Sequence, residues 1–269
     1  MGYLPVHCYF CASKSLKRMQ NKIALITGAT SGIGQATAEK MAQLGIKLIL
    51  CGRRASRMKE VQDHLSQYTS VITLLFDVRN QQQVSEAINS LPEAWKQIDI
   101  LVNNAGNAHG LSPIQDGDIA DWDAMIDGNV KGLLYVSRAV IPLMVSRKTG
   151  HIVNMSSVAG KLTYANGAVY CASKRAVEAI SEGMRLDLTE HGIKVTNIAP
   201  GAVETEFSLV RFKGDAEKAQ KVYEGFDPLQ PGDIADVIIY AVSAPARVTI
   251  ADVTIYAGAQ SAPTTIYRK

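Results

Sequence analysis

The strongest constraint on the fold is a regular alternation of β-rich and helical segments along the chain. Residues 23–27 form a short apolar run that ends in glycines, and Ile33, Thr37 and Met41 then recur at helical spacing. The same alternation continues to a last predicted strand at 248–255. Strands that alternate with helices form a parallel sheet covered on both faces. The sequence therefore predicts a single-domain α/β protein, a Rossmann-type doubly wound parallel sheet of about seven strands.

The remaining elements follow from the same patterns. The predicted strands are 23–27, 46–51, 71–76, 98–102, 152–155, 194–198 and 248–255. The predicted helices are 33–44, 53–67, 82–89, 118–147 with a break near Gly128, 169–190, 216–223 and 233–242. The stretch 200–231 is predicted to be rich in loops, with the polar helical piece at 216–223 inside it.

Composition and charge exclude several classes of function. The 28 basic and 25 acidic side chains give a net charge of +3, which is too balanced for the basic stripe typical of nucleic-acid-binding proteins. No apolar run approaches the roughly 18 residues that a membrane helix needs. The four cysteines are too scattered for a disulfide framework. We therefore expect a cytoplasmic protein with no nucleic-acid or membrane partner.

Residues 1–18 are predicted to be a poorly ordered extension that precedes a domain at 19–269. They do not match a secretory signal, and Met19 stands just before the first strand. Cys8 and Cys11 have a metal-like spacing, but no second Cys or His pair follows at zinc-finger distance. We therefore predict no metal site.

A glycine-rich turn joins the first strand to the first helix, where a dinucleotide pyrophosphate binds in such folds. Gly28 permits a tight turn, Gly32 lets the backbone approach the phosphates, and Gly34 lets helix and strand touch. The helix N-terminus adds free N–H groups and a favourable dipole. The alternative is an ordinary glycine-rich turn. The predicted phosphate-binding residues are Gly28, Ala29, Thr30, Ser31, Gly32, Ile33 and Gly34.

Two arginines, Arg53 and Arg54, follow the second strand where an NAD enzyme usually has an acidic residue for the ribose hydroxyls. Guanidinium groups suit the 2′-phosphate of NADP, because they offer several donors and a permanent charge. The sequence therefore predicts NADP as the cofactor. The alternative is that both arginines are solvated bases at the start of a helix.

The ends of the third and fourth strands supply further predicted cofactor contacts. Asp77, which precedes Val78, either caps a helix or accepts a hydrogen bond from the adenine amino group, and the two roles are compatible. Asn104, Ala105 and Gly106 follow the fourth strand. Small residues there let the backbone pass close to the cofactor.

Tyr170 and Lys174 are four residues apart on a predicted helix, so their side chains share one face. A phenol has an ordinary pKa of about 10, which is high for proton transfer at neutral pH. A nearby ammonium group favours the phenolate, so we expect Lys174 to lower the pKa of Tyr170. Ser156 and Ser157 end the fifth strand, at the sheet edge where such folds bind ligands.

Together these motifs resemble the short-chain dehydrogenase/reductase family. The matching segments are Thr-Gly-x-x-x-Gly-Ile-Gly (27–34), Asn-Asn-Ala-Gly (103–106), Asn129, Ser157, Tyr170-x-x-x-Lys174 and Pro200-Gly201. The resemblance covers 22–255 and implies that Tyr170 is the general acid/base. It also implies that Lys174 holds the nicotinamide ribose and that Ser157, rather than Ser156, binds the substrate oxygen.

The resemblance implies further roles and an assembly. Asn129 would hold a water that relays protons to Lys174, and a helix-kink role is compatible with this. Pro200 and Gly201 would bind the cofactor, while Val203 and Thr205 would contact the nicotinamide amide. The helix of Tyr170 commonly forms a dimer interface in this family, so we expect a homotetramer or homodimer.

A narrower resemblance links the chain to the NADP-dependent 3-hydroxy acid dehydrogenases, which include serine 3-dehydrogenases. It rests on segments 98–106, 121–127 and 206–215. It implies oxidation of short 3-hydroxy acids such as serine, allo-threonine or 3-hydroxyisobutyrate, or reduction of the matching semialdehydes. Arg211 lies in the loop expected to close over the pocket, and we predict that it binds the substrate carboxylate. The alternative is a surface arginine or a tetramer contact.

Two other functions remain open from the sequence alone. A reductase of another carbonyl, such as a 3-oxoacyl thioester, a diketone or a sugar, would share the fold and cofactor and differ in the loop after Pro200. A non-catalytic NADP-binding regulator would usually lack the tyrosine or the lysine. His109 follows the fourth strand, and a loop position is favoured over a place in the pocket.

Overall fold

A computed structural model describes residues 18–269, and seven of its strands form one sheet. The strand order is β3-β2-β1-β4-β5-β6-β7, and every neighbouring pair is parallel. The strands are β1 (Ile23–Thr27), β2 (Lys47–Gly52), β3 (Val71–Leu75), β4 (Ile100–Asn103), β5 (Gly150–Met155), β6 (Ile193–Pro200) and β7 (Asp252–Ile255). The predicted doubly wound fold is confirmed. The predicted extension, apart from Arg18, and the Cys8–Cys11 spacing lie outside the described residues.

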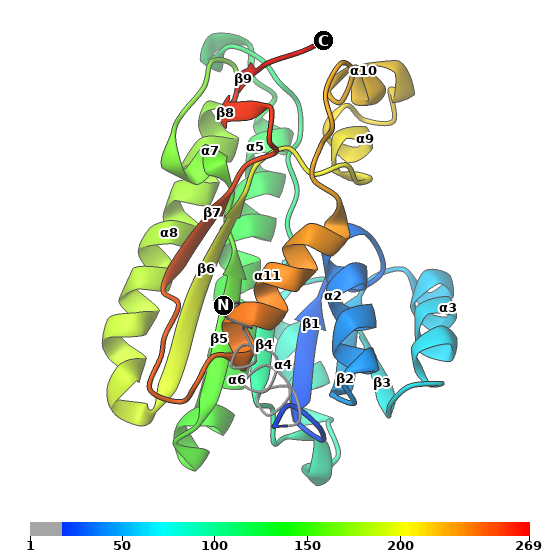
Figure 1. Cartoon of the computed structure of the whole chain (residues 1–269), viewed down its shortest axis with the longest axis vertical. Helices are drawn as coiled ribbons and strands as arrows, with labels where there is room; N and C mark the ends of the chain where they lie inside the picture. The colour runs from blue at the N-terminus through cyan, green and yellow to red at the C-terminus, as the bar shows by residue number, and fades with distance from the viewer. Residues whose placement is uncertain (1–17) are drawn as a thin grey trace, which may run out of the picture.

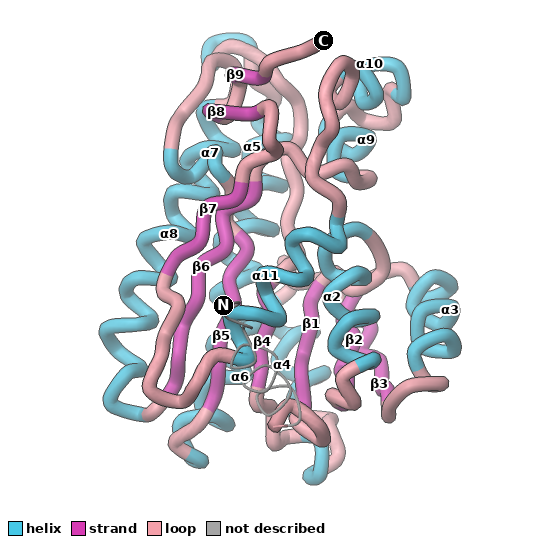
Figure 2. The backbone as a smooth tube through the Cα atoms, in the orientation of Figure 1, coloured by secondary structure: helices cyan, strands magenta, loops and turns pink. Residues whose placement is uncertain are grey.

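Helices cover both faces of the sheet (Figures 1 and 2). One face carries α2 (Gly32–Gln43), α3 (Ala55–Leu65) and α11 (Pro231–Ser243). The other carries α4 (Gln81–Asn89), α6 (Gly132–Arg147) and α8 (Ala168–Leu188).

Side chains along each strand alternate between the two faces. On β1, Ala24 and Ile26 join the core cluster under α2 and α11, whereas Ile23 and Leu25 join the cluster under α6. Both faces of the sheet are therefore covered at its centre, which explains why β1, β2 and β4 are mostly apolar. Within the described chain, no helix combines the length and apolarity needed to cross a membrane.

The long helix predicted at 118–147 is interrupted, as the sequence indicated near Gly128. It consists of α5 (Ile119–Ile126), a π-helical turn (Asp127–Lys131) and α6. Such turns bend a helix and often lie at functional sites. Here the turn places Asn129 next to the segment that follows β4.

Several predicted element boundaries were wrong. The helix predicted from 53 begins at Ala55. The last strand of the parallel sheet, β7, begins at Asp252 rather than at 248. The segment after Pro200 contains α9 (Phe207–Arg211), which was not predicted, besides α10 (Ala216–Lys221). Also unpredicted are the short helix α7 (Val158–Lys161) and the hairpin of β8 (Gln260–Ala262) and β9 (Thr265–Ile266). Figure 1 shows α9 and α10 beyond the carboxyl ends of the strands.

Candidate active site

A cavity of about 690 Å³ runs along the carboxyl ends of the strands. It brings together most of the residues that the sequence predicted for cofactor, catalysis and substrate. They are Gly28, Thr30, Ser31, Gly32, Ile33, Arg53, Arg54, Asp77, Val78, Asn104, Ala105, Gly106, Ser157, Tyr170, Lys174, Pro200, Gly201, Val203, Thr205 and Arg211. Residues from distant parts of the sequence thus line one continuous space.

Three predicted site residues do not line this cavity. Ala29 is fully buried and belongs to the core cluster under α2 and α11. Gly34 packs against the turn itself, since a Cβ there would lie 2.3 Å from the Gly28 carbonyl oxygen. Asn129 is also buried and contacts the site through a neighbouring loop.

The glycine turn has the form that a phosphate cradle requires. Gly28 has a φ of +66°, and a Cβ there would lie 2.9 Å from Asn104 Nδ2. Helix α2 begins at Gly32, and the side chain of its N-cap residue, Ser31, makes no capping hydrogen bond. The backbone N–H groups at this helix end therefore have no capping side chain, and the residues that carry them line the cavity, where such groups suit an anion. These residues fit a dinucleotide pyrophosphate.

Strand β4 is tied to this turn by Thr27. The hydroxyl Oγ1 of Thr27 accepts hydrogen bonds from the backbone N–H groups of Asn104 and Ala105, both at 3.0 Å. Asn104 Nδ2 in turn donates to the Thr27 carbonyl oxygen at 2.9 Å. The backbone from Asn104 to Gly106 is thereby held beside the cavity.

Arg54 lies at the end of the cavity nearest α3. Its Nη2 donates to Thr30 Oγ1 at 2.9 Å and to Ser31 Oγ at 2.8 Å, and its Nη1 donates to Glu206 at 3.0 Å. Arg53, the neighbouring arginine, donates to Asp77 Oδ2 at 3.1 Å. Both arginines therefore lie at the cavity, with carboxylates as their partners.

Asp77 does not cap a helix, which corrects one of its two predicted roles. Asn80 caps α4 instead, with its side chain accepting from Gln83 N at 3.0 Å. Burial raises the pKa of Asp77, but hydrogen bonds from Arg79 and the nearby charge of Arg53 outweigh burial and hold the pKa at about 2. Asp77 is thus ionised at the cavity edge.

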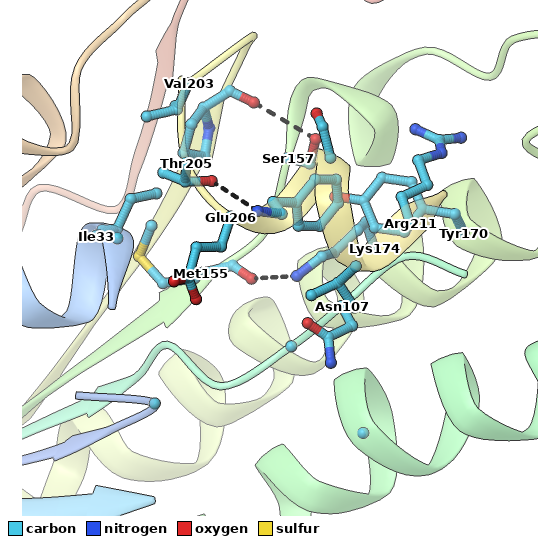
Figure 3. Close-up of a pocket in the computed structure, with 18 of the residues that line it drawn as sticks. Ile33, Asn107, Met155, Ser157, Tyr170, Lys174, Val203, Thr205, Glu206 and Arg211 are labelled. Atoms are coloured by element: carbon cyan, nitrogen blue, oxygen red, sulfur yellow. Dashed lines mark hydrogen bonds between the residues drawn. The ribbon is translucent and has the colours of Figure 1, made fainter. Parts of the chain in front are cut away.

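Tyr170 and Lys174 lie one helical turn apart on α8, and both are more than nine-tenths buried. Lys174 Nζ donates to the Met155 carbonyl oxygen at 2.9 Å (Figure 3). Ser157 Oγ accepts from Ala159 N at 3.1 Å, at the N-terminus of α7. Ser156, by contrast, donates its hydroxyl to the Lys174 carbonyl oxygen, so it is engaged with the backbone of α8.

The expected lowering of the Tyr170 pKa is not found. Burial raises the pKa of Tyr170, and its hydrogen bond with Ser157 and the charge of Arg211 only partly offset this. Burial also lowers the pKa of Lys174 to about 8, against the opposing charge of Glu178. The prediction was wrong because it considered the charge of Lys174 and left out burial, which raises the pKa of Tyr170 and lowers that of Lys174. Tyr170 is therefore a protonated phenol at neutral pH and can donate to a carbonyl oxygen.

Asn129 holds the loop after β4 against α8. Its Oδ1 accepts from Asn107 N at 2.7 Å, and its Nδ2 donates to the Asn107 carbonyl oxygen at 2.8 Å and to Ser173 Oγ at 3.0 Å. Its position in the π-helical turn agrees with the kink role. The water relay to Lys174 stays a prediction.

Arg211, on α9, lies over the candidate catalytic tyrosine. Its guanidinium carbon is 5.6 Å from the ring centres of both Tyr164 and Tyr170. Its Nη2 donates to the Tyr164 hydroxyl at 3.0 Å, and its Nε donates to the Gly110 carbonyl oxygen at 3.3 Å. Figure 3 shows Arg211 beside Tyr170. Arg211 is thus part of the cavity wall rather than a simple surface residue.

Several cavity residues were missed by the sequence reasoning. Tyr164, Glu206 and Phe207 line the cavity, and so does His109, for which a loop position had been favoured. The Phe207 ring packs 5.7 Å from the Tyr170 ring. Glu206 and Phe207 belong to segment 206–215, on which the resemblance to the 3-hydroxy acid dehydrogenases rests, and that resemblance could have indicated their place in the site.

The described residues contain no group of His, Cys, Asp and Glu that could hold a metal ion. Cys51 and Cys171 are buried free thiols, and burial raises the pKa of Cys51. The Cys51 thiol therefore lacks the low pKa of a reactive cysteine.

Comparison with known proteins identifies the family. Residues 22–215 match the sequence profile of the short chain dehydrogenases. The chain is 46% identical to the NADP-dependent 3-hydroxy acid dehydrogenase of Salmonella typhi, over 89% of this chain and 96% of the relative. It is also 46% identical to sulfoacetaldehyde reductase 2 of Chromohalobacter salexigens, over 85% of this chain and 91% of the relative.

Solved structures agree with these relatives. The closed form of serine dehydrogenase complexed with NADP+ superposes with a TM-score of 0.86 at 43% identity, covering 92% of this chain and all of that one. The serine dehydrogenase of Escherichia coli gives a TM-score of 0.74 at 38% identity, covering 87% and 96%. The chain therefore belongs to the short-chain dehydrogenase family, and it is an enzyme that acts on hydroxyl groups.

Proposed function

We propose that the protein is an NADP-dependent oxidoreductase that interconverts a short 3-hydroxy acid and its semialdehyde. Substrates of the serine, allo-threonine or 3-hydroxyisobutyrate type carry a carboxylate close to the reacting carbon. The observation that supports this choice is the place of Arg211, whose guanidinium lies beside Tyr170. Among the described residues no carboxylate forms an ion pair with Arg211, so its charge is available for an anionic substrate.

The distance between Arg211 and Tyr170 supports a short substrate. The guanidinium carbon of Arg211 is 5.6 Å from the Tyr170 ring centre, so one small molecule can reach both groups. A carboxylate on Arg211 would leave the neighbouring hydroxyl carbon near the phenol and Ser157. A planar guanidinium binds a carboxylate through two parallel hydrogen bonds, which fixes orientation as well as affinity.

The cofactor end follows from the residues present. The turn from Gly28 to Gly32 and the N-terminus of α2 would hold the pyrophosphate, and Arg53 and Arg54 would hold the 2′-phosphate. When bound, NADP supplies or accepts the hydride. The contacts of Val203 and Thr205 with the nicotinamide remain part of this proposal.

The protein's own residues handle the proton at the substrate oxygen. In reduction, the Tyr170 hydroxyl donates its proton to the carbonyl oxygen, and Ser157 holds that oxygen by a hydrogen bond. The Lys174 ammonium stabilises the phenolate that remains. In oxidation Tyr170 takes the proton back, which requires the phenolate. Asn129 supports this arrangement by holding the Asn107 loop.

A second candidate is reduction of an aldehyde that carries a sulfonate. It is favoured by the likeness to the Chromohalobacter enzyme, whose name specifies sulfoacetaldehyde. A sulfonate would occupy the same guanidinium of Arg211. Neutral carbonyls such as diketones or sugars would leave this partly buried charge unpaired, which is unfavourable. A non-catalytic regulator would not need the complete set of Ser157, Tyr170 and Lys174.

We further propose a homotetramer or homodimer in the cytoplasm, as the family resemblance and the composition imply. The carboxylate preference is tested by following NADPH absorbance with L-serine, L-allo-threonine, 3-hydroxyisobutyrate and neutral alcohols, and in reduction with sulfoacetaldehyde. Turnover of the hydroxy acids with NADP would support the proposal. Activity on neutral substrates alone would refute it.

A further inference from the structure

Glu206 lies between two arginines at the proposed 2′-phosphate site. Its Oε2 accepts a hydrogen bond from Arg54 Nη1 at 3.0 Å. Arg57 Nη1 donates to both carboxylate oxygens of Glu206, at 2.6 and 2.8 Å. An internal carboxylate therefore already occupies one of the two arginines that the sequence assigns to the phosphate.

Arg54 is anchored independently of Glu206. Its Nε and Nη2 donate to Thr30 Oγ1 at 3.2 and 2.9 Å, and its Nη2 also donates to Ser31 Oγ at 2.8 Å. These bonds fix the guanidinium at the edge of the glycine turn. Its position can therefore stay the same while the anion bound to it changes.

The balance of interactions favours an exchange of anions at Arg54. The side chains of Arg54 and Glu206 are 43% and 42% exposed, and ion pairs at such exposure are weak. A phosphate dianion carries up to about twice the charge of a carboxylate and, like a carboxylate, can accept two parallel hydrogen bonds from a guanidinium. Glu206 would still have a partner after the exchange, because Arg57 contacts both of its oxygens.

Glu206 also connects the two ends of the cavity. It directly precedes α9, which carries Phe207 and Arg211 against Tyr170. Figure 3 shows Glu206 next to Thr205, with Ile33 on one side and the group around Tyr170 on the other. Glu206 therefore contacts Arg54 and Arg57 at the proposed 2′-phosphate site and also directly precedes the helix that borders the proposed substrate site.

We propose that Glu206 is a specificity-determining residue for the cofactor. It occupies Arg54 as an internal anion, exchanges this partner for the 2′-phosphate, and then remains bound to Arg57 alone. This proposal rests on the placement of the 2′-phosphate at Arg54 in the proposed function. Since NAD has no phosphate at that position, Glu206 should weaken the binding of NADP and leave that of NAD unchanged.

The test is isothermal titration of the cofactor-free protein with NADP+ and NAD+, for the wild type, Glu206→Gln and Glu204→Gln. Glu204 lies in the same segment, and its carboxylate accepts from Gln230 rather than from an arginine. Glu204→Gln therefore removes one negative charge from this segment, as Glu206→Gln does, without removing a partner of an arginine. We expect Glu206→Gln to bind NADP+ about fivefold more tightly, the size of a weak surface ion pair. NAD+ binding and both affinities of Glu204→Gln should match the wild type.

An unchanged or weaker affinity of Glu206→Gln for NADP+ would overturn the proposal, as would an equal gain for NAD+. Arg54→Ala separates this failure from a failure of the cofactor placement. If Arg54→Ala leaves the ratio of NADP+ to NAD+ affinity unchanged, the 2′-phosphate does not bind there. If Arg54→Ala lowers that ratio and Glu206→Gln has no effect, the role of Glu206 alone is wrong.

Discussion

The guanidinium of Arg211 and the ring of Tyr170 lie 5.6 Å apart, although they come from different elements. Tyr170 belongs to α8, which packs on the sheet, whereas Arg211 ends the short helix α9. The pair sets a cation beside the proposed proton donor, which is the arrangement that the proposed anionic substrate would require.

The first prediction concerns Arg211→Met, which keeps the aliphatic stem and removes the charge. It should raise KM for carboxylate substrates roughly 10- to 100-fold, because a charge-assisted hydrogen bond is lost. KM for a neutral ketone should stay close to that of the wild type. Lys213→Met removes an exposed charge from the same loop and serves as the control. Equal effects of Arg211→Met on charged and neutral substrates would count against the carboxylate role.

The second prediction concerns the pH dependence of reduction. Burial lowers the pKa of Lys174 to about 8, so its ammonium is lost as the pH rises through 8. We expect kcat/KM for reduction to fall above that pH. Because the charge of Glu178 raises the pKa of Lys174, Glu178→Gln should move this fall to lower pH.

Glu182→Gln, an exposed change on the same helix, is the matched control for Glu178→Gln and should leave the profile unchanged. A profile of Glu178→Gln that coincides with the wild type would show that Lys174 does not set the descending limb.

The third prediction concerns stability in acid. His151 is a buried residue of β5, and its Nε2 lies 2.8 Å from Oγ1 of Thr196 on β6. Burial, together with Lys194 and Lys22, lowers its pKa from 6.5 to about 4. Protonation therefore favours the unfolded chain, and stability present above pH 6.5 is lost as the pH falls toward 4.

Between pH 7 and 5 this one group should cost about 2 kcal/mol of unfolding free energy. In urea unfolding, the free energy of unfolding of His151→Gln should lose most of this dependence on pH. His64→Gln, at an exposed histidine of α3, should retain it. If His151→Gln and the wild type lose the same stability in acid, His151 is not the responsible group.

The fourth prediction concerns the glycine turn. A Cβ at Gly34 would lie 2.3 Å from the Gly28 carbonyl oxygen and 2.4 Å from Asn104 Nδ2. Gly34→Ala must shift backbone, so we expect a loss of about 1–3 kcal/mol in stability and weaker NADP+ binding. Gly232→Ala, where a Cβ meets nothing within 4 Å, should be neutral or stabilising by up to about 1 kcal/mol. Similar behaviour of the two variants would contradict this packing argument.

The features that the sequence predicted best are local ones. The turn from Gly28 to Gly34 and the pair Tyr170 and Lys174 depend on residues within one or two helical turns, so spacing alone places them. The alternation of segments then defines a parallel sheet, which collects the strand ends at one edge.

Other features depend on contacts between distant residues. Glu206 meets Arg54 across 152 positions of sequence, and no local pattern indicates that pairing. The pKa of Tyr170 was predicted in the wrong direction, because burial of a side chain cannot be judged from helical spacing. Asp77 was assigned a cap that belongs to Asn80, since the turn after β3 delays the start of α4.

The most direct test of the central claim is the Tyr170→Phe variant, measured for both NADPH binding and turnover. The phenyl ring preserves the packing against Phe207 and Arg211 and removes only the hydroxyl. We predict that NADPH binds as in the wild type, while turnover of the hydroxy acid falls roughly 100- to 10,000-fold, the contribution expected of a general acid/base. Turnover equal to that of the wild type would show that Tyr170 is not the proton donor and would contradict the proposed mechanism.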